Sequence, residues 1–450
     1  MAVYSIINKS QLEGALRLDA EYYQPEYLEM EKLLSKVPFD FLKNLTNKIC
    51  RGKQPKYVET GKIFAFTSDQ IRNDFIDTIS ARYTDEAFYK NNSKAQVKPF
   101  DVLLNSTGIG TLGRVNFYYL DKKAVVDSHI TIISTIPEKL DPIFLNVFLK
   151  TKFGQYQISR NYSGSSGQIE LYPEQIKEFK IFTPSLKIQK DIAALILQAI
   201  EWHQKSELFY SQAENLLLEE LGLKDFKVED DLFYIINLSQ IKSAHRADAE
   251  YFQPKYKRLI KRIEKFSEPL LKVVDNIPAR FNPYLTPDKI FKYVELEHIN
   301  TSIGIIDGYI EILGNEAPSR AKRVLKEKDV IFSSVEGSLK KVALVHKEQE
   351  GYLASTGFFQ FRCKKFLPEY FLVLAKSIVL QMQFEKETAG TILTAVPKEA
   401  LKNIIIPILP KLTQQKIADL VQKSHEARKK AKELLEEAKR KVEKLIEENK

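Results

Sequence analysis

The sequence predicts an α+β protein made of two similar mixed domains and two long helices that pack on each other. The first observation is a repeat: residues 6–27 read IINKSQLEGALRLDAEYYQPEY and residues 235–256 read IINLSQIKSAHRADAEYFQPKY, with 14 of 22 positions identical. The second observation is that residues 185–221 and 411–450 contain neither proline nor glycine, as long helices require. A repeat on this scale indicates two similar domains related by approximate symmetry.

Length and composition indicate several folded domains and a polyanionic partner. A chain of 450 residues with 44% hydrophobic residues is long enough for two to four domains with their own cores. The net charge of +9 favours nucleic acid or an anionic membrane surface as partner. We find no apolar run long enough to span a bilayer and no apparent secretory signal. Cys50 and Cys363 are far apart, so we expect two idle thiols and a cytoplasmic location.

The repeat continues beyond the opening motif. Residues 101–107 (DVLLNST) resemble residues 329–335 (DVIFSSV), and residues 189–196 (QKDIAALI) resemble residues 414–421 (QQKIADLV). Between these landmarks the two halves have nearly unrelated side chains. The sequence therefore predicts that the repeated segments form a common structural frame. The residues between them, which we call the filling, differ between the two halves.

The filling of each half predicts short strands followed by helices. Strand-like runs are rich in β-branched and aromatic residues and are bounded by turns, and we expect helices over residues 142–159 and 368–386. Each half then holds a mixed domain of roughly 150 residues. The predicted strands are residues 63–67, 101–105, 115–120, 130–133, 292–296, 330–332, 342–345 and 358–362. The predicted domains are residues 1–185 and 223–410, with helices over 186–222 and 411–450.

Both long segments carry a heptad seam with small residues in its middle, which lets a partner helix approach closely. An alternative is that each helix packs only on its own domain. We expect the two helices to pack on each other, because similar seams occur at equivalent places. A helix of about 35 residues is about 50 Å long. The seams are Ile188, Ile192, Leu195, Ala199, Trp202, Ser206, Phe209, Ala213 and Leu216, and Ile417, Leu420, Ser424, Ala427, Ala431, Leu434, Ala438, Lys441 and Leu445.

The sequence contains partial matches to catalytic and cofactor-binding motifs, but no complete one. Residues 108–113 (GIGTLG) fit the dinucleotide-binding pattern, but that pattern needs a following helix, and here a strand-like RVNFYY follows. We therefore predict a β-turn. Residues 282–284 (NPY) lack one proline of the methyltransferase NPPY loop, and the six histidines form no metal-binding cluster. We predict no catalytic and no metal-binding residues, which favours a binding module or scaffold.

The motif R-x-D-A-E-Y-[YF]-Q-P-x-Y at residues 17–27 and 246–256, with the two Gln-x-x-Ile-Ala helices, resembles the specificity (S) subunit of type I restriction–modification systems. Residues 101–114, the loop at 163–168 and the IFTPS exit at 181–185 also resemble parts of that family's target recognition domains. The second half departs from the pattern at its turn, where Glu336 and Lys340 replace glycines.

This resemblance implies two mixed α/β target recognition domains separated by two long antiparallel coiled-coil helices, with a pseudo-two-fold internal repeat. Each domain would read one half of a bipartite site in double-stranded DNA. Two modification (methyltransferase) subunits and restriction/translocase subunits would be partners, and S-adenosylmethionine, ATP and Mg would bind those subunits, with no cofactor on this chain. The alternative is a two-domain coiled-coil scaffold that binds proteins.

In the first domain, the candidate DNA contacts are polar residues at strand ends and turns. Arginine and lysine suit phosphates or guanine, and glutamine suits adenine. For the loop after residue 50, an ordinary solvated loop is an equal alternative. For His129, the equal alternative is a structural histidine. The candidates are Arg51, Lys53, Gln54, Lys56, Ser68, Asp69, Asn105, Ser106, Thr107, Arg114, His129, Ser163, Ser165, Ser166 and Gln168.

In the second domain, the candidates follow from alignment of the frame. The repeated DAEY motif itself is expected to pack in the frame, since an identical motif cannot discriminate two different half-sites. We expect the charged residues 428–432 to be solvated or to meet modification subunits. The candidate contacts are Arg280, Asn282, Tyr284, Glu295, His298, Ser333, Ser334, Lys340 and Thr391.

Overall fold

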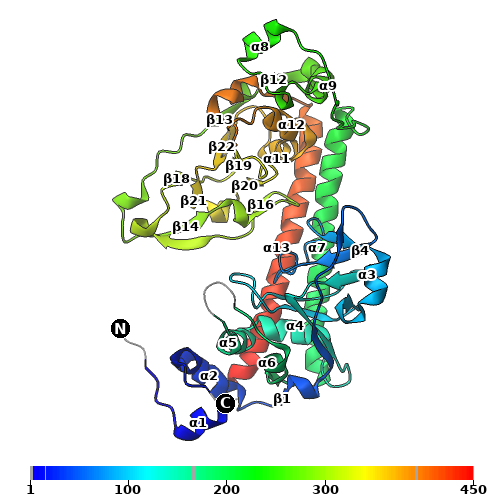
Figure 1. Ribbon diagram of the computed structural model, residues 1–450. Helices are drawn as coiled ribbons and strands as arrows, with labels where there is room; N and C mark the ends of the chain where they lie inside the picture. Colours follow the sequence, from blue (N-terminus) through cyan, green and yellow to red (C-terminus); the bar gives the residue numbers. More distant parts are fainter. Residues whose placement is uncertain (1–3, 16, 165–168, 391–393, 449–450) are drawn as a thin grey trace. The chain divides into compact units, whose positions relative to one another are not determined.

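The structure is a computed structural model that describes residues 4–15, 17–164, 169–390 and 394–448 (Figure 1). The chain forms two compact units. Unit 1 contains the residues up to Trp202 and those from Lys430 onward, and unit 2 contains residues 203–429. Each unit therefore combines one mixed domain with parts of both long helices, α7 (Leu186–Glu220) and α13 (Lys411–Glu448). None of the helices in the described ranges is long and apolar enough to cross a membrane.

The described residues of unit 1 form three sheets. A small antiparallel pair joins β1 and β11, a four-stranded sheet has the order β2-β10-β7-β8, and a five-stranded sheet has the order β3-β5-β4-β9-β6. Within the last sheet, β4 and β9 are parallel. The strands are β1 (Phe39–Phe41), β2 (Thr46–Arg51), β3 (Tyr57–Val58), β4 (Ile63–Phe66), β5 (Arg82–Thr84), β6 (Gln96–Val97), β7 (Val102–Asn105), β8 (Val115–Phe117), β9 (Ala124–Val126), β10 (Ile130–Thr135) and β11 (Lys180–Phe182).

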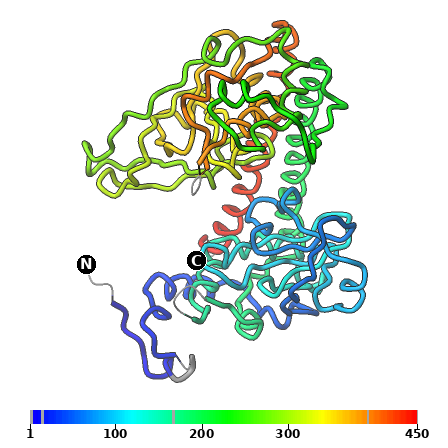
Figure 2. Tube along the Cα trace, turned by 45° about the horizontal axis from the view of Figure 1, so that its top comes forward, coloured from blue at the N-terminus to red at the C-terminus, as the bar shows by residue number. Residues whose placement is uncertain are grey.

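The described residues of unit 2 also form three sheets. The backbone that carries them runs from green through yellow to orange in Figure 2. The orders are β12-β23, β13-β22-β19-β20-β16-β15 and β17-β14-β21-β18. The strands are β12 (Ser267–Pro269), β13 (Val274–Asn276), β14 (Ile290–Val294), β15 (Ile299–Asn300), β16 (Ile305–Ile306), β17 (Ile310–Leu313), β18 (Ala321–Val324), β19 (Val330–Ser333), β20 (Val342–Leu344), β21 (Leu353–Ser355), β22 (Phe358–Cys363) and β23 (Ile405–Pro407).

The two units repeat one topology. The run β2-β10-β7-β8 corresponds to β13-β22-β19-β20, and the parallel pair of β4 with β9 corresponds to that of β14 with β21. Unit 2 adds β16 and β15 to the edge of its larger sheet. The predicted α+β fold with an internal repeat is confirmed.

The helices expected over residues 142–159 and 368–386 are each divided in two, which corrects the prediction of single helices. Thr151 separates α4 from α5, and Ser377 separates α11 from α12, because each residue is extended and its side chain caps the second helix. Gly154 permits the close packing at the first division, since a Cβ there would lie 2.4 Å from Leu149 Cα. The bounds are α4 (Pro142–Lys150), α5 (Lys152–Asn161), α11 (Pro368–Lys376) and α12 (Ile378–Lys386).

The remaining helices are short and surround these elements. They are α1 (Lys9–Ala15), α2 (Pro25–Leu34), α3 (Glu86–Asn91) and α6 (Pro173–Lys177) in unit 1, and α8 (Leu238–Ala244), α9 (Pro254–Ile263) and α10 (Leu270–Val273) in unit 2.

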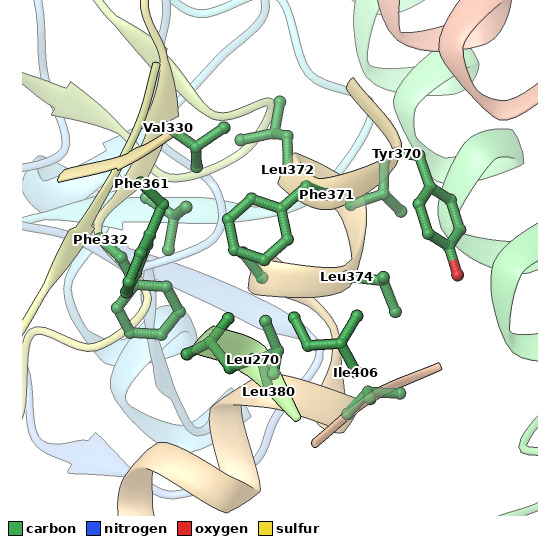
Figure 3. Packing of buried hydrophobic residues seen from close by; sticks show 14 of the residues in the cluster. Leu270, Val330, Phe332, Phe361, Tyr370, Phe371, Leu372, Leu374, Leu380 and Ile406 are labelled. Carbon is green, nitrogen blue, oxygen red and sulfur yellow. The ribbon is translucent and has the colours of Figure 1, made fainter. Parts of the chain in front are cut away.

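Aromatic and branched side chains fill the core of unit 2 between its larger sheet and α11 and α12 (Figure 3). Phe332 of β19 stacks on Phe384 of α12 with ring centroids 4.0 Å apart, and Phe361 meets Phe371 edge to face. Tyr210 and Leu217 of α7 and Val421 of α13 belong to the same core. The largest hydrophobic cluster of unit 2 therefore joins its domain to both long helices.

The long helices pack on each other within each unit, and small residues mark the contact. In unit 1, Ile192 and Ile196 of α7 share a core with Ala438 and Val442 of α13. In unit 2, Ser424 donates a hydrogen bond of 2.7 Å to the carbonyl of Ser206. The first half of α7 thus meets the last half of α13 in unit 1, and the second half of α7 meets the first half of α13 in unit 2, as antiparallel helices do.

The predicted set of buried positions on α13 is wrong near the C-terminal end of the helix. Ser424, Ala431 and Ala438 are buried as expected, but Lys441 is exposed and Val442 is buried in its place. The reason is geometric: a straight helix has 3.6 residues per turn, so a strict heptad drifts around it with each repeat.

Arg428 was expected on a solvated face, and this prediction is wrong. Its side chain is only 2% exposed and forms an ion pair of 2.6 Å with Asp307, while the neighbouring His425 bonds the carbonyl of Ile303 at 2.8 Å. These contacts bind α13 to the segment between β15 and β17. A buried guanidinium needs such a partner, because desolvating an unpaired charge is costly.

The repeated DAEY motif makes the same local contacts in both units. Arg17 pairs with Asp19 and lies 5.0 Å from the ring centroid of Tyr22. Arg246 likewise pairs with Asp248 and lies 4.5 Å from that of Tyr251. In each motif the arginine holds the pKa of the neighbouring aspartate below its ordinary value, through a side-chain hydrogen bond. These internal contacts fit the expected role in the frame.

Candidate nucleic-acid interface

Loops at one end of the four-stranded sheet bring several predicted residues of unit 1 together. Thr107 follows β7, His129 precedes β10, and isolated bridges pair Glu170 with both Thr107 and Ser163. Together they surround a depression of about 410 Å³, which we call the unit 1 hollow. Its lining residues are Thr107, His129, Ser163, Gly164, Glu170 and Tyr172.

Arg51, at the end of β2, adjoins the unit 1 hollow. Its guanidinium donates a hydrogen bond of 3.1 Å to the carbonyl of Leu171 and lies 3.6 Å from a carboxylate oxygen of Glu170. It also lies 5.0 Å from the ring centroid of Tyr172, a cation–π distance. The pKa of Tyr172 is raised by the Glu170 carboxylate, first through a hydrogen bond and then through charge. A cation, an anion and an aromatic ring therefore meet at this position.

His129 presents its ring to solvent while its backbone holds the turn. Its N–H donates to a carboxylate oxygen of Asp127 at 2.9 Å, and its carbonyl accepts from the N–H of Ser106 at 2.8 Å. Burial raises the pKa of Asp127. The backbone of His129 is thus structural, and the exposed imidazole remains available for a ligand.

The loop after Arg51 is ordered by hydrogen bonds and exposes lysine side chains. Lys53 donates a hydrogen bond of 2.8 Å to Asn92, and Gln54 donates one of 3.2 Å to the hydroxyl of Tyr57. Lys53, Gln54 and Lys56 are all exposed. Gly52 lets the loop pass close to β9, because a Cβ there would lie 2.3 Å from the carbonyl oxygen of Val126.

Three predicted contact residues are instead buried, and we assign them a structural role. Asn105 donates a hydrogen bond of 2.8 Å to the carbonyl of Ser68, and the hydroxyls of Ser106 and Thr131 share one of 2.6 Å. Ser333 accepts from a backbone N–H two residues later. Because Asn105, Ser106 and Ser333 are fully buried, their side chains do not reach the surface.

Two further candidates in unit 1, Ser68 and Arg114, contact Asn105. The carbonyls of Ser68 and Arg114 accept hydrogen bonds from the side chain and the backbone of Asn105. The side chains of Ser68 and Arg114 are half-buried, and Asp69 is exposed. Ser163 is half-buried in the hollow, where its hydroxyl accepts from Gln175 at 3.1 Å.

In unit 2, Arg280, Asn282 and Tyr284 lie in the loop between β13 and β14, which matches in topology the loop after Arg51. Asn282 accepts a hydrogen bond from the N–H of Tyr284 at 3.2 Å, and the Tyr284 hydroxyl donates to the carbonyl of Ala317 at 2.8 Å. All three side chains are exposed. The loop is therefore ordered by its own polar contacts and leaves Arg280 free to face a ligand.

The other candidates in unit 2 are spread over separate loops. His298 accepts from the N–H of Glu295 at 2.9 Å and lies 3.6 Å from Glu297, so its ring is held in place. Ser334 donates to the carbonyl of Gly357 at 3.0 Å, and Lys340 is exposed. Glu295 and His298 adjoin β15, whereas Ser334 and Lys340 lie between β19 and β20.

Ser165, Ser166, Gln168 and Thr391 lie outside the described residues. Glu170 and Tyr172, which line the unit 1 hollow, were missed by sequence reasoning. They follow the GSSGQ loop at irregular spacing, and only the bridges to Thr107 and Ser163 bring Glu170 to the site.

The described residues contain no group of three or more histidine, cysteine, aspartate or glutamate side chains that could hold a metal. Burial raises the pKa of both Cys50 and Cys363, so neither is an activated thiolate at neutral pH. The glycines at 108, 110 and 113 have positive φ, and β8 follows them. Residues 108–113 therefore form the expected turn, and no helix presents its N-terminus to a dinucleotide.

Comparison with known proteins identifies the family. The sequence profile of the type I restriction modification DNA specificity domain matches residues 41–206 and 283–440, about seven-tenths of the chain. Each matched region covers most of one repeated domain and part of the long helix that follows it. This family model is that of a DNA-recognition protein. The chain belongs to the family of type I restriction modification DNA specificity domains.

Solved structures similar to this chain include an S subunit and an HsdS subunit. An S subunit of a type I restriction-modification system from M. genitalium is 13% identical, with 92% of this chain and 96% of that chain covered and a TM-score of 0.42. The HsdS subunit from Thermoanaerobacter tengcongensis is 14% identical, with 92% and 97% covered and a TM-score of 0.30. A comparison with curated proteins finds no match.

Proposed function

We propose that this chain is the sequence-specificity subunit of a type I restriction–modification enzyme and has no catalytic activity of its own. Each domain reads one half of a bipartite site in double-stranded DNA. The long helices act as a spacer between the two readers and as a docking frame for two methyltransferase subunits. Restriction/translocase subunits complete the assembly. S-adenosylmethionine, ATP and Mg bind those partners and not this chain.

The main support for this function is that the two units share one backbone arrangement but have different loops. In unit 1, the side-chain amide of Gln157 donates to the carbonyl of Lys180 and accepts from its N–H, in the last strand of the unit. In unit 2, Gln383 makes the same pair of hydrogen bonds with Ile405, also in the last strand. The loops attached to this frame differ in length and in side chains. A protein that recognises two identical half-sites would not need different loops in its two units. A protein that recognises two different half-sites does need them.

The length of the helices suits a spacer. Helices of 35 and 38 residues are about 50 to 57 Å long. One turn of B-DNA is about 34 Å. A rigid spacer on this scale would set a fixed number of unread base pairs between the half-sites.

The test is to map N6-methyladenine across the genome of the host, with and without the gene for this chain. The proposal predicts one methylated bipartite motif with a fixed gap, and its loss on deletion. Persistence of every such motif after deletion would refute the proposal.

A binding measurement separates this function from a protein-binding scaffold. With the methyltransferase subunits present, the affinity for cognate duplex should fall steeply as salt rises, because phosphate contacts release counterions. Weak association that is insensitive to salt would instead favour the scaffold.

A further inference from the structure

We infer that the unit 1 hollow is a base-reading site, in which the carboxylate of Glu170 accepts a hydrogen bond from the exocyclic amino group of a cytosine or adenine, and that the matching residues which the structure describes in unit 2 lack this polar set. This inference rests on the proposed function and names the chemistry of one of its contact points.

The backbone around the unit 1 hollow is repeated in unit 2. The bridges of Glu170 to Thr107 and Ser163 have counterparts in the bridges of Ala395 to Val335 and Ala389. The connecting hydrogen bonds correspond as well. The N–H of Ser106 donates to the carbonyl of residue 129 at 2.8 Å, and the N–H of Ser334 donates to that of residue 357 at 2.8 Å. Residues can therefore be matched one to one across the two units.

The matched side chains are polar in unit 1 and small or apolar in unit 2. Thr107 corresponds to Val335, Ser163 to Ala389, and Glu170 to Ala395. By the same hydrogen bonds, His129 corresponds to Gly357 and Tyr172 to Pro397.

Arg51 likewise has no charged counterpart at the matching position of unit 2. Ile132 of β10 pairs with Cys50, and the equivalent Gln360 of β22 accepts a hydrogen bond from the N–H of Ile277. The residue after Cys50 is Arg51, and the residue after Ile277 is Pro278, which carries no charge.

This comparison shows that the polar set is not needed to build the fold. Unit 2 forms the same bridges and backbone hydrogen bonds without it. Within the described residues, the buried hydroxyl of Thr107 has no hydrogen-bond partner although it lines the hollow. Polar side chains that the backbone does not require, gathered around an open hollow, are suited to a ligand.

The chemistry of the hollow selects particular bases. A carboxylate only accepts hydrogen bonds, and in the major groove only cytosine N4 and adenine N6 donate them. Guanine and thymine present acceptors there, which would face the Glu170 carboxylate without a proton between them. Arg51 positions the carboxylate and offsets its repulsion from the phosphates, and one-third of the Glu170 side chain remains exposed to meet a base.

The test uses the full chain with its methyltransferase subunits, and maps methylated motifs for wild type, Glu170→Ala and Glu170→Gln. Glu170→Ala should lose about tenfold discrimination at one cytosine or adenine position, in one half-site only. Glu170→Gln keeps the shape and can also donate, so it should accept guanine or thymine at that position. Which base is specified in wild type distinguishes cytosine N4 from adenine N6.

Two further variants complete the experiment. Glu174→Gln removes an exposed carboxylate four residues away and should leave the motif unchanged. Ala395→Glu with Val335→Thr restores two polar groups to unit 2, and should alter the preference in the other half-site.

Unchanged motifs in both Glu170 variants would overturn the inference. So would a change in the other half-site, or an equal loss of methylation at all sites, which would mark Glu170 as structural. If wild type yields no bipartite motif, the proposed function itself has failed, and this outcome is distinct from the others.

Discussion

At the scale of single residues, two glutamines explain why the Gln-x-x-Ile-Ala motif is repeated. Gln189 accepts from the N–H of Asp141 at 2.8 Å and donates to the carbonyl of Pro184 at 2.9 Å. Gln414 accepts from the N–H of Leu367 at 3.3 Å and donates to the carbonyl of Leu409 at 2.8 Å. Each glutamine ties the start of a long helix to the start of a domain helix.

Replacing Gln414 by alanine should therefore destabilise unit 2. The side chain is buried, so the substitution leaves two backbone groups without their partner, at a cost of about 1–3 kcal/mol. Denaturant unfolding of the full chain measures the change. Gln415→Ala, at an exposed position one residue later, is the matched control and should have little effect. Equal effects of the two variants would contradict this role.

Glu31 makes the stability of unit 1 depend on pH. Burial alone would raise the pKa of this carboxyl, but hydrogen bonds from Arg160 and Lys180 outweigh it and hold the pKa below the ordinary value of 4.5. The folded state therefore favours the charged form. Its contribution to stability is complete above pH 4.5 and is lost as the pH falls through the lower, folded-state pKa.

The corresponding measurement is unfolding free energy against pH for wild type and Glu31→Gln. The variant should be less stable at neutral pH, and the difference should shrink below pH 4.5. Glu26→Gln, at an exposed position of the same helix, provides the control. A difference that stays constant from pH 7 to pH 3 would argue against the ion pairs.

The residue scale is also where sequence reasoning was weakest. A short polar residue at a strand end can face outward to a ligand or inward to the backbone, and local pattern does not distinguish the two. Asn105 turns inward because its hydrogen-bond partner is Ser68, 37 positions away. Glu170 was missed for the converse reason: long-range pairing alone places it in the hollow.

At the scale of elements, small residues set how closely α7 and α13 pack. Ser206 and Ser424 are fully buried, and the hydroxyl of Ser424 reaches the backbone of the facing helix. Larger side chains at these positions would separate the two helices.

We predict that Ser424→Leu destabilises unit 2 by about 1–3 kcal/mol, because a well-packed contact has no room for the added volume. Thermal unfolding of the full chain checks this. Lys423→Leu places the same side chain at the adjacent exposed position and should be nearly neutral. A neutral Ser424→Leu variant would mean that the helices are not in close contact there.

Periodicity predicted the elements better than their ends. The long helices follow directly from the placement of proline and glycine. The β-branched and aromatic runs predicted eight of the 23 strands in the described residues, namely β4, β7, β8, β10, β14, β19, β20 and β22. The divisions at Thr151 and Ser377 were not predicted, because a single capping residue ends a helix without disturbing the hydrophobic pattern around it. Arg428 shows the same limit: its charge suggests solvent, and only the fold supplies Asp307.

At the scale of the whole molecule, the repeat in the sequence already predicted two domains built on one plan. The structure adds that the plan is a set of backbone hydrogen bonds, repeated where the side chains differ. The reading surfaces could not be predicted in the same way, since the two fillings share too few residues to be aligned without the bridges that relate Thr107 to Val335.

The most direct test of the central claim is to exchange residues 30–185 for the corresponding domain of another family member and to map N6-methyladenine in cells that carry the hybrid and its methyltransferase subunits. We expect that one half of the bipartite motif changes, while the other half and the gap stay as in wild type. The reciprocal exchange of residues 259–410 should change only the other half. A hybrid that changes both halves, or neither, would contradict the claim that each domain reads one half-site.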